Sequence, residues 1–95
     1  MRILLAEDDR LLAEAVARAL RQSAHSVEVA PGGREADDAL AAGEFDLVIL
    51  DVNLPQMDGF EVLRRLRARK SRVPVLVLTV RESVEDRVNG LDLGA

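Results

Sequence analysis

The sequence contains no cysteine and very few aromatic residues. Without Cys, disulfide scaffolds, thiolate metal sites and thiol catalysis are excluded, and the absence fits a reducing compartment. Phe45 and Phe60 are the only aromatic residues, which is too few for the stacking surfaces of single-strand nucleic-acid binders. Long hydrophobic runs are missing too, because the opening apolar run 3–6 meets Glu7 before it is long enough for a signal peptide or a membrane span. We therefore expect a cytoplasmic protein with no membrane contact.

Size and charge indicate a single folded domain. The chain has 95 residues, of which 48% are apolar and 32% are charged, as in ordinary globular sequences. Its 13 basic and 17 acidic residues give a net charge of −4. Because duplex-DNA binders usually carry a basic excess, this balance argues against direct DNA binding by the chain.

Short apolar runs alternate with segments that have a helical period. We expect strands at 3–6, 26–30, 47–50 and 73–78. Each expected strand is followed by an expected helix. Four successive βα units predict an α/β fold with a parallel sheet and right-handed crossovers.

The expected helices have start signals and apolar stripes. Asp9 can cap the first helix, and Asp58 with Glu61 resembles a capping box for the third. The second helix follows the turn at 31–33 and stops near Gly43. The apolar positions of the first, third and fourth helices are Leu11, Leu12, Ala15, Val16, Ala19 and Leu20; Phe60, Leu63 and Leu66; and Val84, Val88 and Leu91.

Acidic residues follow two of the expected strands. Glu7, Asp8 and Asp9 come after the first strand. Asp51 comes after the third, and Thr79 follows the fourth. In an open parallel sheet these strand ends meet at one edge, where ligands bind. Carboxylates gathered there repel one another unless a cation lies among them, and oxygen ligands without His or Cys favour Mg²⁺, with Mn²⁺ as the alternative. Asp9 taken alone is better explained as a helix cap.

Several segments give the chain a resemblance to a known family. The segment 51–59, DVNLPQMDG, fits the pattern D-x-x-x-P-x-M-D-G, and the opening 3–9, ILLAEDD, fits a strand followed by an acidic pair. Leu78 and Thr79 fit a strand that ends in a switch hydroxyl. With the run 90–95, these motifs resemble the response regulator receiver domain of two-component signalling over all 95 residues. The resemblance implies a flavodoxin-like, doubly wound parallel sheet with strand order 2-1-3-4, the (βα)4 portion of a (βα)5 receiver.

The resemblance also implies a role for each site residue. Asp51 accepts a phosphoryl group from a sensor histidine kinase, and the chain catalyses nothing beyond this phosphotransfer and the hydrolysis of its aspartyl phosphate. Asp8, Asp51 and the backbone carbonyl of Asn53 ligate Mg²⁺, and Glu7 acts through the shell around it. Thr79 hydrogen-bonds the phosphoryl group, which the amide of Asn53 and that of the residue after Thr79 help to hold.

Two departures from the family pattern stand out. The family has a phosphate-contacting Lys on a fifth strand, whereas the only Lys here is Lys70, at the end of the third helix. We therefore expect residues 1–95 to form a receiver that stops before the fifth strand and fifth helix and has no effector domain. The strand at 75–78 is then an apolar edge through which the fragment self-associates. The other departure is Val80, where the family usually has Ala or Gly and a branched side chain crowds the phosphate pocket.

The output of the protein is inferred by analogy, and other functions stay open. The opening 1–9 resembles regulators with a C-terminal winged-helix DNA-binding domain, so we expect the full-length protein to regulate transcription. The alternatives are a pseudo-receiver that serves only as an interaction module and a flavin- or nucleotide-binding domain of the same architecture. Carboxylates after the first strand count against the latter because they repel phosphate.

Three further features have simple structural explanations. Six basic residues within 64–72 are better explained by the C-terminus of a helix than by a nucleic-acid surface. His25 is interpreted as a surface loop residue. Gly32 and Gly33 are interpreted as a turn, because no Gly-Lys-Ser/Thr sequence follows them.

Overall fold

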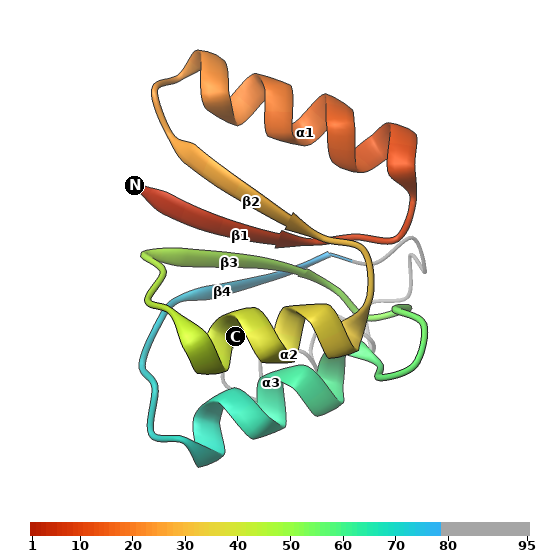
Figure 1. Ribbon diagram of the computed structural model, residues 1–95, viewed down its shortest axis with the longest axis vertical. Coiled ribbons are helices and arrows are strands. Elements are labelled where there is room, and N and C mark those ends of the chain that lie inside the picture. The colour runs from red at the N-terminus through yellow and green to blue at the C-terminus, as the bar shows by residue number, and fades with distance from the viewer. Residues whose placement is uncertain (79–95) are drawn as a thin grey trace.

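Strands and helices alternate along the part of the chain that the computed structural model describes, residues 1–78 (Figure 1). The elements are β1 (Arg2–Ala6), α1 (Arg10–Gln22), β2 (Ser26–Ala30), α2 (Gly33–Ala42), β3 (Leu47–Asp51), α3 (Gly59–Ala68) and β4 (Val75–Leu78). The expected fourth helix, Thr79 and Val80 lie outside the described residues. Within residues 1–78, no helix is long and apolar enough to cross a membrane.

The strands form one parallel sheet in the order β2-β1-β3-β4. This order confirms the flavodoxin-like arrangement that the family resemblance implied. Ala6 at the end of β1 is level with Ala30 on β2 and Leu50 on β3, so these strands end at the same edge of the sheet. Because β1 and β3 are neighbours, the residues that follow them are brought side by side.

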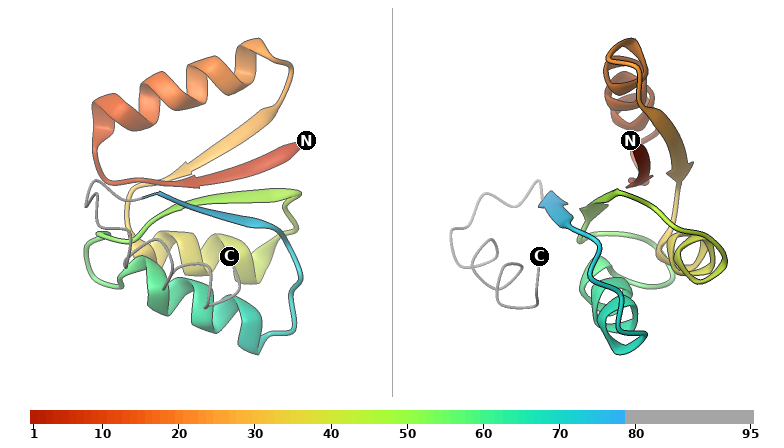
Figure 2. Two further views of the ribbon diagram at one scale, coloured as in Figure 1. Left: turned by 180° about the vertical axis from the view of Figure 1, so that it is seen from behind. Right: turned by 90° about the vertical axis from the view of Figure 1, so that its left-hand side faces the viewer.

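Helices cover both faces of the sheet, with α1 on one side and α2 and α3 on the other (Figure 2). Successive residues of a strand point to opposite faces, and β1 therefore contributes to both cores. The apolar cluster under α1 contains Ile3, Leu5, Ala13, Ala17 and Ile49. The larger cluster under α2 and α3 contains Leu4, Ala6, Ala30, Ala36, Leu40, Val48, Leu50, Leu54, Val62, Leu63, Leu66 and Val75. Each fully buried large side chain contributes about 1.5–3 kcal/mol, so both clusters hold the helices firmly on the sheet.

The buried stripe of α1 differs from the expected one. Ala13 and Ala17 are buried, and Val16 and Leu20 pack beside them at helical spacing. Two small residues at the centre of the stripe allow the helix backbone to come close to the sheet. The prediction holds for Val16 and Leu20 and fails at the other positions, because residues 11–20 carry apolar side chains on two adjacent stripes and periodicity alone does not choose between them. The expected positions that are exposed instead are Leu11, Leu12, Ala15 and Ala19.

β4 begins at Val75, two residues later than expected. The preceding Pro74 has no N–H to donate, and its carbonyl accepts a bond from the Val48 amide at 3.0 Å. The carbonyl of Val73 is already taken by the Arg67 guanidinium at 2.7 Å. Local side-chain bonding therefore shortens the strand at its start.

The start of α3 only partly follows the expected capping box. Asp58 accepts a hydrogen bond from the Glu61 amide at 2.9 Å, as an N-cap should. The carboxylate of Glu61, however, accepts bonds from Arg64 and Arg65 further along the helix. Of the expected apolar positions, Leu63 and Leu66 are buried and Phe60 is half-buried.

Candidate metal centre

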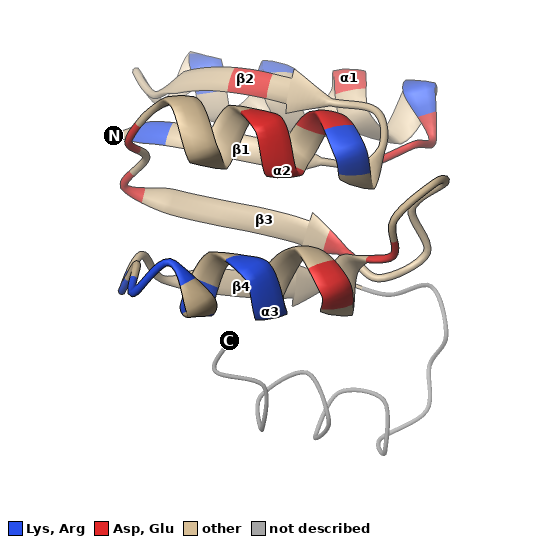
Figure 3. Ribbon diagram, turned by 60° about the horizontal axis from the view of Figure 1, so that its bottom comes forward, with Lys and Arg blue, Asp and Glu red and all other residues tan. Residues whose placement is uncertain are grey.

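Three carboxylates meet where β1 and β3 end. One carboxylate oxygen from each of Glu7, Asp8 and Asp51 lies within 4.8 Å of the others. Glu7 directly follows β1 and Asp51 is the last residue of β3, at neighbouring positions in the register. Figure 3 shows acidic residues both at the end of β3 and along the segment that leads from β1 into α1. The sheet order therefore places the expected acids together.

Two of these acids are buried. Glu7 is 6% exposed and Asp51 is 5% exposed, whereas Asp8 is exposed to solvent. Glu7 accepts a hydrogen bond from the Asp9 amide at 2.9 Å, and Asp51 accepts one from the Asn53 amide at 3.1 Å. A buried charge is costly unless it is paired, so one amide bond each leaves both carboxylates in need of a positive partner.

The pKa of Glu7 reflects this crowding. The pKa of Glu7 is raised from 4.5 to about 7, chiefly by burial and to a smaller extent by the nearby carboxylates of Asp51 and Asp8, while the Asp9 amide acts in the opposite direction. Near neutral pH the group of acids therefore holds on to a proton that a cation can replace.

The donor set fits a hard divalent cation. Its three carboxylates supply only oxygen ligands, and the acids are close enough to share one ion. Mg²⁺ and Mn²⁺ prefer such ligands, whereas structural zinc sites rely on nitrogen and sulfur. The positions of Glu7, Asp8 and Asp51 are thus compatible with the metal-binding role expected for them.

The loop from Val52 to Asp58 is fixed beside these acids by backbone contacts. The Gly59 amide donates to the Val52 carbonyl at 3.0 Å, which closes the loop at its base. A side chain on Gly59 would overlap the backbone of Asp51 and Val52, so only glycine fits there. Gln56 has a φ of 71°, a left-handed conformation that is unfavourable for a residue with a side chain. The loop carries Asn53, whose side chain is exposed.

A hollow opens next to the acids. It has a volume of about 410 Å³ and lies between α1 and the end of β2. Its lining residues are Glu7, Asp8, Arg10, Ala13, Glu14, Val29 and Pro31. Nearby on α1, Leu11 is 79% exposed and Leu12 is 39% exposed. Sequence reasoning missed this exposed apolar surface because it assigned both leucines to the buried stripe.

The remaining residues singled out in the sequence lie elsewhere. Asp9 caps α1 by accepting a bond from the Leu12 amide at 3.1 Å, in agreement with its interpretation as a cap. His25 contacts the N-terminal amino group, 3.2 Å from its Nδ1 atom. Thr79 and Val80, expected at the phosphate pocket, fall beyond residue 78 and outside the described part of the chain.

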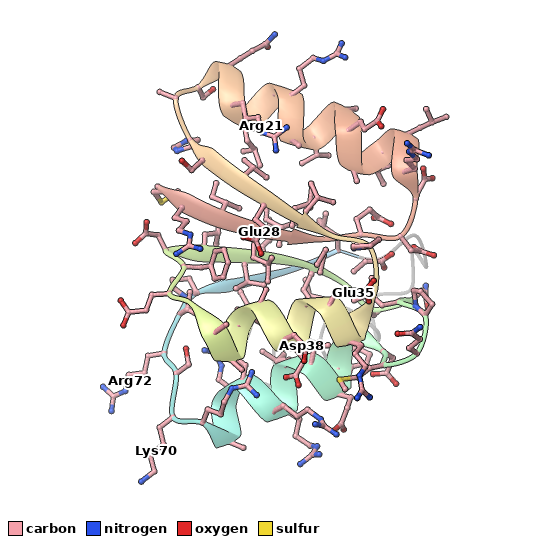
Figure 4. The ribbon with its side chains drawn as sticks, in the orientation of Figure 1. Arg21, Glu28, Glu35, Asp38, Lys70 and Arg72 are labelled. Atoms are coloured by element: carbon pink, nitrogen blue, oxygen red, sulfur yellow. The ribbon has the colours of Figure 1, made fainter. Side chains whose placement is uncertain are left out.

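The basic residues around the end of α3 mostly have partners within the domain. Arg64 and Arg65 pair with Glu61, and Arg69 pairs with Asp37 on α2 at 3.0 Å. Lys70 and Arg72 extend outward from the segment between α3 and β4 (Figure 4). Of the basic residues in this run, Arg65 and Arg69 link α3 to Asp37 on α2 and the other pairs lie within α3, which favours a structural role over a nucleic-acid surface.

The comparison with known proteins identifies the family. The family model described as the response regulator receiver domain matches residues 3–95. The chain belongs to this family. Over 95 residues the receiver is 50% identical to the response regulator MprA of Mycolicibacterium vanbaalenii, and it covers 41% of that protein. The chain thus spans less than half the length of this curated relative.

Solved receivers share the fold. The BeF3-activated N-terminal receiver domain of Klebsiella pneumoniae RstA is 33% identical, with a TM-score of 0.92 over 100% of this chain and 80% of that one. The response regulator TrrA of Thermotoga maritima, solved in complex with Mg²⁺–BeF, is 28% identical, with a TM-score of 0.85 over 95% of this receiver and 78% of that chain. The receiver family and its flavodoxin-like fold are therefore both established for this chain.

Proposed function

We propose that this receiver is a phosphorylation-dependent switch in which Asp51 accepts a phosphoryl group from a sensor histidine kinase. The observation that carries the proposal is the buried Asp51 carboxylate, grouped with Glu7 and Asp8 at the carboxyl edge of the sheet. The similar receivers RstA and TrrA, solved with BeF3 and Mg²⁺–BeF respectively, support a receiver that takes a phosphoryl-like group and a metal ion.

The chemistry assigned to Asp51 is nucleophilic attack. A carboxylate oxygen attacks the phosphorus of a phosphohistidine, the P–N bond breaks, and the imidazole leaves with the electron pair as the acyl phosphate forms. The Asn53 amide, which donates to Oδ1 of Asp51, orients the carboxylate. Glu7, Asp8, Asp51 and the Asn53 carbonyl are the residues proposed to hold Mg²⁺. When bound, that ion offsets the negative charge of the carboxylates and the phosphoryl oxygens.

The proposal extends to the whole protein of which receivers of this kind form part. Thr79 is proposed to bond the phosphoryl group and to signal its presence. The full-length protein is proposed to regulate transcription through a separate DNA-binding domain, in the cytoplasm. Residues 1–95 then act as the receiver unit, with no activity beyond phosphotransfer and hydrolysis of the aspartyl phosphate.

Intact-mass measurement after incubation with acetyl phosphate and Mg²⁺ tests the proposal. We expect one added phosphoryl group on the wild-type chain, and none with Asp51→Asn or when EDTA removes the metal. Asp58→Asn is the matched control, because Asn also caps helices and Asp58 lies in the same loop. It should be phosphorylated like the wild type. A wild-type chain that gains no mass, alone and within a longer receiver, would favour the pseudo-receiver alternative.

A further inference from the structure

The first residue of α2 lies against the loop that follows Asp51. Gly33 is buried, and its amide donates a hydrogen bond to the Pro55 carbonyl at 3.2 Å. Figure 1 shows the loop after β3 next to the N-terminal end of α2. Gly33 and Pro55 are separated in the sequence by the rest of α2 and by β3, so this is a tertiary contact.

There is no space for a side chain at this contact. A Cβ atom on Gly33 would overlap the Met57 carbonyl oxygen and would lie 2.6 Å from its carbon and 2.8 Å from the Met57 Cβ. The obstacle is backbone, which does not move aside as a flexible side chain does. Gly32 provides the contrast, because a Cβ there would meet only the end of the Glu35 side chain, at 2.6 Å.

A displacement of Met57 would be transmitted to the acids. The loop is closed by the bond between Gly59 and Val52 and attached to Asp51 through the Asn53 amide. Within it, Gln56 keeps its left-handed conformation, with a φ of 71°, and such conformations persist only where surrounding contacts impose them. Gly33 contacts the residues on both sides of Gln56, since its amide bonds the Pro55 carbonyl and its Cα lies against the Met57 backbone.

We propose that Gly33 is a positioning residue for the phosphoacceptor site. Gly33 leaves space for the Met57 backbone and donates a hydrogen bond to Pro55. These contacts fix the position of the loop that carries Asn53, and therefore the position of Asn53 relative to Asp51 and the metal site. This inference rests on the proposed function, but the position of the loop can be measured independently of it.

Gly33→Ala compared with Gly32→Ala tests this role. In metal-free protein we expect the backbone amide resonances of residues 52–58 to shift far more in Gly33→Ala than in Gly32→Ala. In Mg²⁺ titrations we expect about tenfold or greater loss of affinity for Gly33→Ala only. Leu40→Ala, a core change on α2, serves as the stability control and should lower the melting temperature without that loss.

A stabilised background keeps the test usable if Gly33→Ala unfolds. Ala24 and Lys70 have φ values of 68° and 65°, far from the acids, and glycine is preferred in that conformation after helices. The substitutions Ala24→Gly and Lys70→Gly can therefore be combined with each variant.

Each outcome is decisive. Equal Mg²⁺ affinity and equal loop resonances in the Gly33 and Gly32 variants would overturn the inference while leaving the proposed function intact. Loss of affinity together with displaced loop resonances would support it. A wild-type chain that binds no Mg²⁺ and accepts no phosphoryl group would remove the proposed function. In that case the loop resonances alone decide whether Gly33 positions residues 52–58.

Discussion

Glu7 and Asp51 are the charged residues that the structure buries within residues 1–78. Other charged residues form ion pairs near the surface, such as Arg10 with Glu14 and Arg64 with Glu61, where a pair contributes little to stability. Two buried carboxylates side by side have no benefit for folding, because each opposes ionisation of the other. Their placement at the carboxyl edge of the sheet fits the proposed metal site, and this is the residue-scale argument for a functional role.

The surface carboxylate Glu61 behaves in the opposite way. Hydrogen bonds from Arg64 and then Arg65 lower the pKa of Glu61 from 4.5 to about 2. A carboxyl with a lowered pKa stabilises the folded state above its unfolded pKa, and that contribution disappears as the pH falls toward the folded value. Glu61→Gln should therefore be less stable than the wild type near pH 6, with the difference vanishing between about pH 4.5 and pH 2.

Urea unfolding of both proteins across that pH range measures the difference. The comparison isolates Glu61 because the other carboxyl groups titrate in both chains. The Glu61 amide still donates to Asp58 in the variant, so the helix cap is preserved. A difference that stays constant from pH 6 to pH 2 would contradict the prediction.

At the residue scale, the acids of the site could be predicted from the sequence and the role of Gly33 could not. Glu7 and Asp8 follow the apolar strand β1, Asp51 ends the apolar strand β3, and parallel strands end at a common edge. The lack of space at Gly33 depends on the backbone of Met57, 24 positions away in the sequence. Two successive glycines after a strand are explained equally well by a simple turn. No local sequence pattern distinguishes such a turn from a glycine that is required by a close tertiary contact.

At the scale of elements, α1 presents an apolar surface to solvent beside the site. Leu11 is 79% exposed and directly follows Arg10, which lines the same hollow as Glu7 and Asp8. Single exposed leucines are common, but an adjacent pair at the start of α1, the helix that follows Glu7 and Asp8, suits a partner that must bring its phosphohistidine to the proposed phosphoacceptor. We predict that this surface contacts the proposed histidine kinase.

Leu11→Glu should slow phosphotransfer from a histidine kinase that phosphorylates the wild-type chain, by about tenfold, the effect of ~1.4 kcal/mol of lost contact. Phosphorylation by acetyl phosphate should stay unchanged, because a small donor needs no docking surface. Ala19→Glu is the control, since Ala19 is exposed near the other end of the same helix. Equal slowing with both donors would indicate damage to the site itself and contradict the assignment.

The elements themselves were predictable in kind but not in their packing details. Alternating strands and helices followed from periodicity over residues 1–78. The prediction of the buried stripe of α1 missed Ala13 and Ala17, because their burial depends on how closely a helix can approach the sheet. The start of β4 was wrong because Arg67 takes the Val73 carbonyl, a side-chain bond that periodicity does not reveal.

For the whole molecule, the strand order came from the family resemblance and not from the pattern of apolar residues. Periodicity gives strands and helices, whereas many sheet orders are compatible with successive βα units. The order β2-β1-β3-β4 is what brings Glu7 to Asp51. The site thus depends on topology as much as on its own residues.

β4, at one edge of the described sheet, exposes an apolar side chain to solvent. Within residues 1–78, β4 pairs with β3 alone, and Leu76 is 53% exposed. An apolar strand with free backbone groups pairs readily with another chain. We predict that the 95-residue chain forms dimers or larger species at micromolar concentration and that Leu76→Lys shifts it toward the monomer.

Sedimentation velocity over a concentration series checks this prediction. Val29→Lys is the control, because Val29 is 38% exposed on β2 at the opposite edge of the sheet. It should leave the association unchanged. A wild-type chain that sediments as a monomer at every concentration would contradict self-association through β4.

The central position of β1 has a consequence for how the chain folds during its synthesis. β1 is made first, yet Ile3 pairs with Val27 on one side and with Leu47 on the other. β1 therefore cannot complete its pairing until both β2 and β3 have emerged from the ribosome. Such non-local pairing slows folding. Glu7 meets Asp51 only when the second of these pairings is complete, so the acids become neighbours late, after most of the apolar core has been translated.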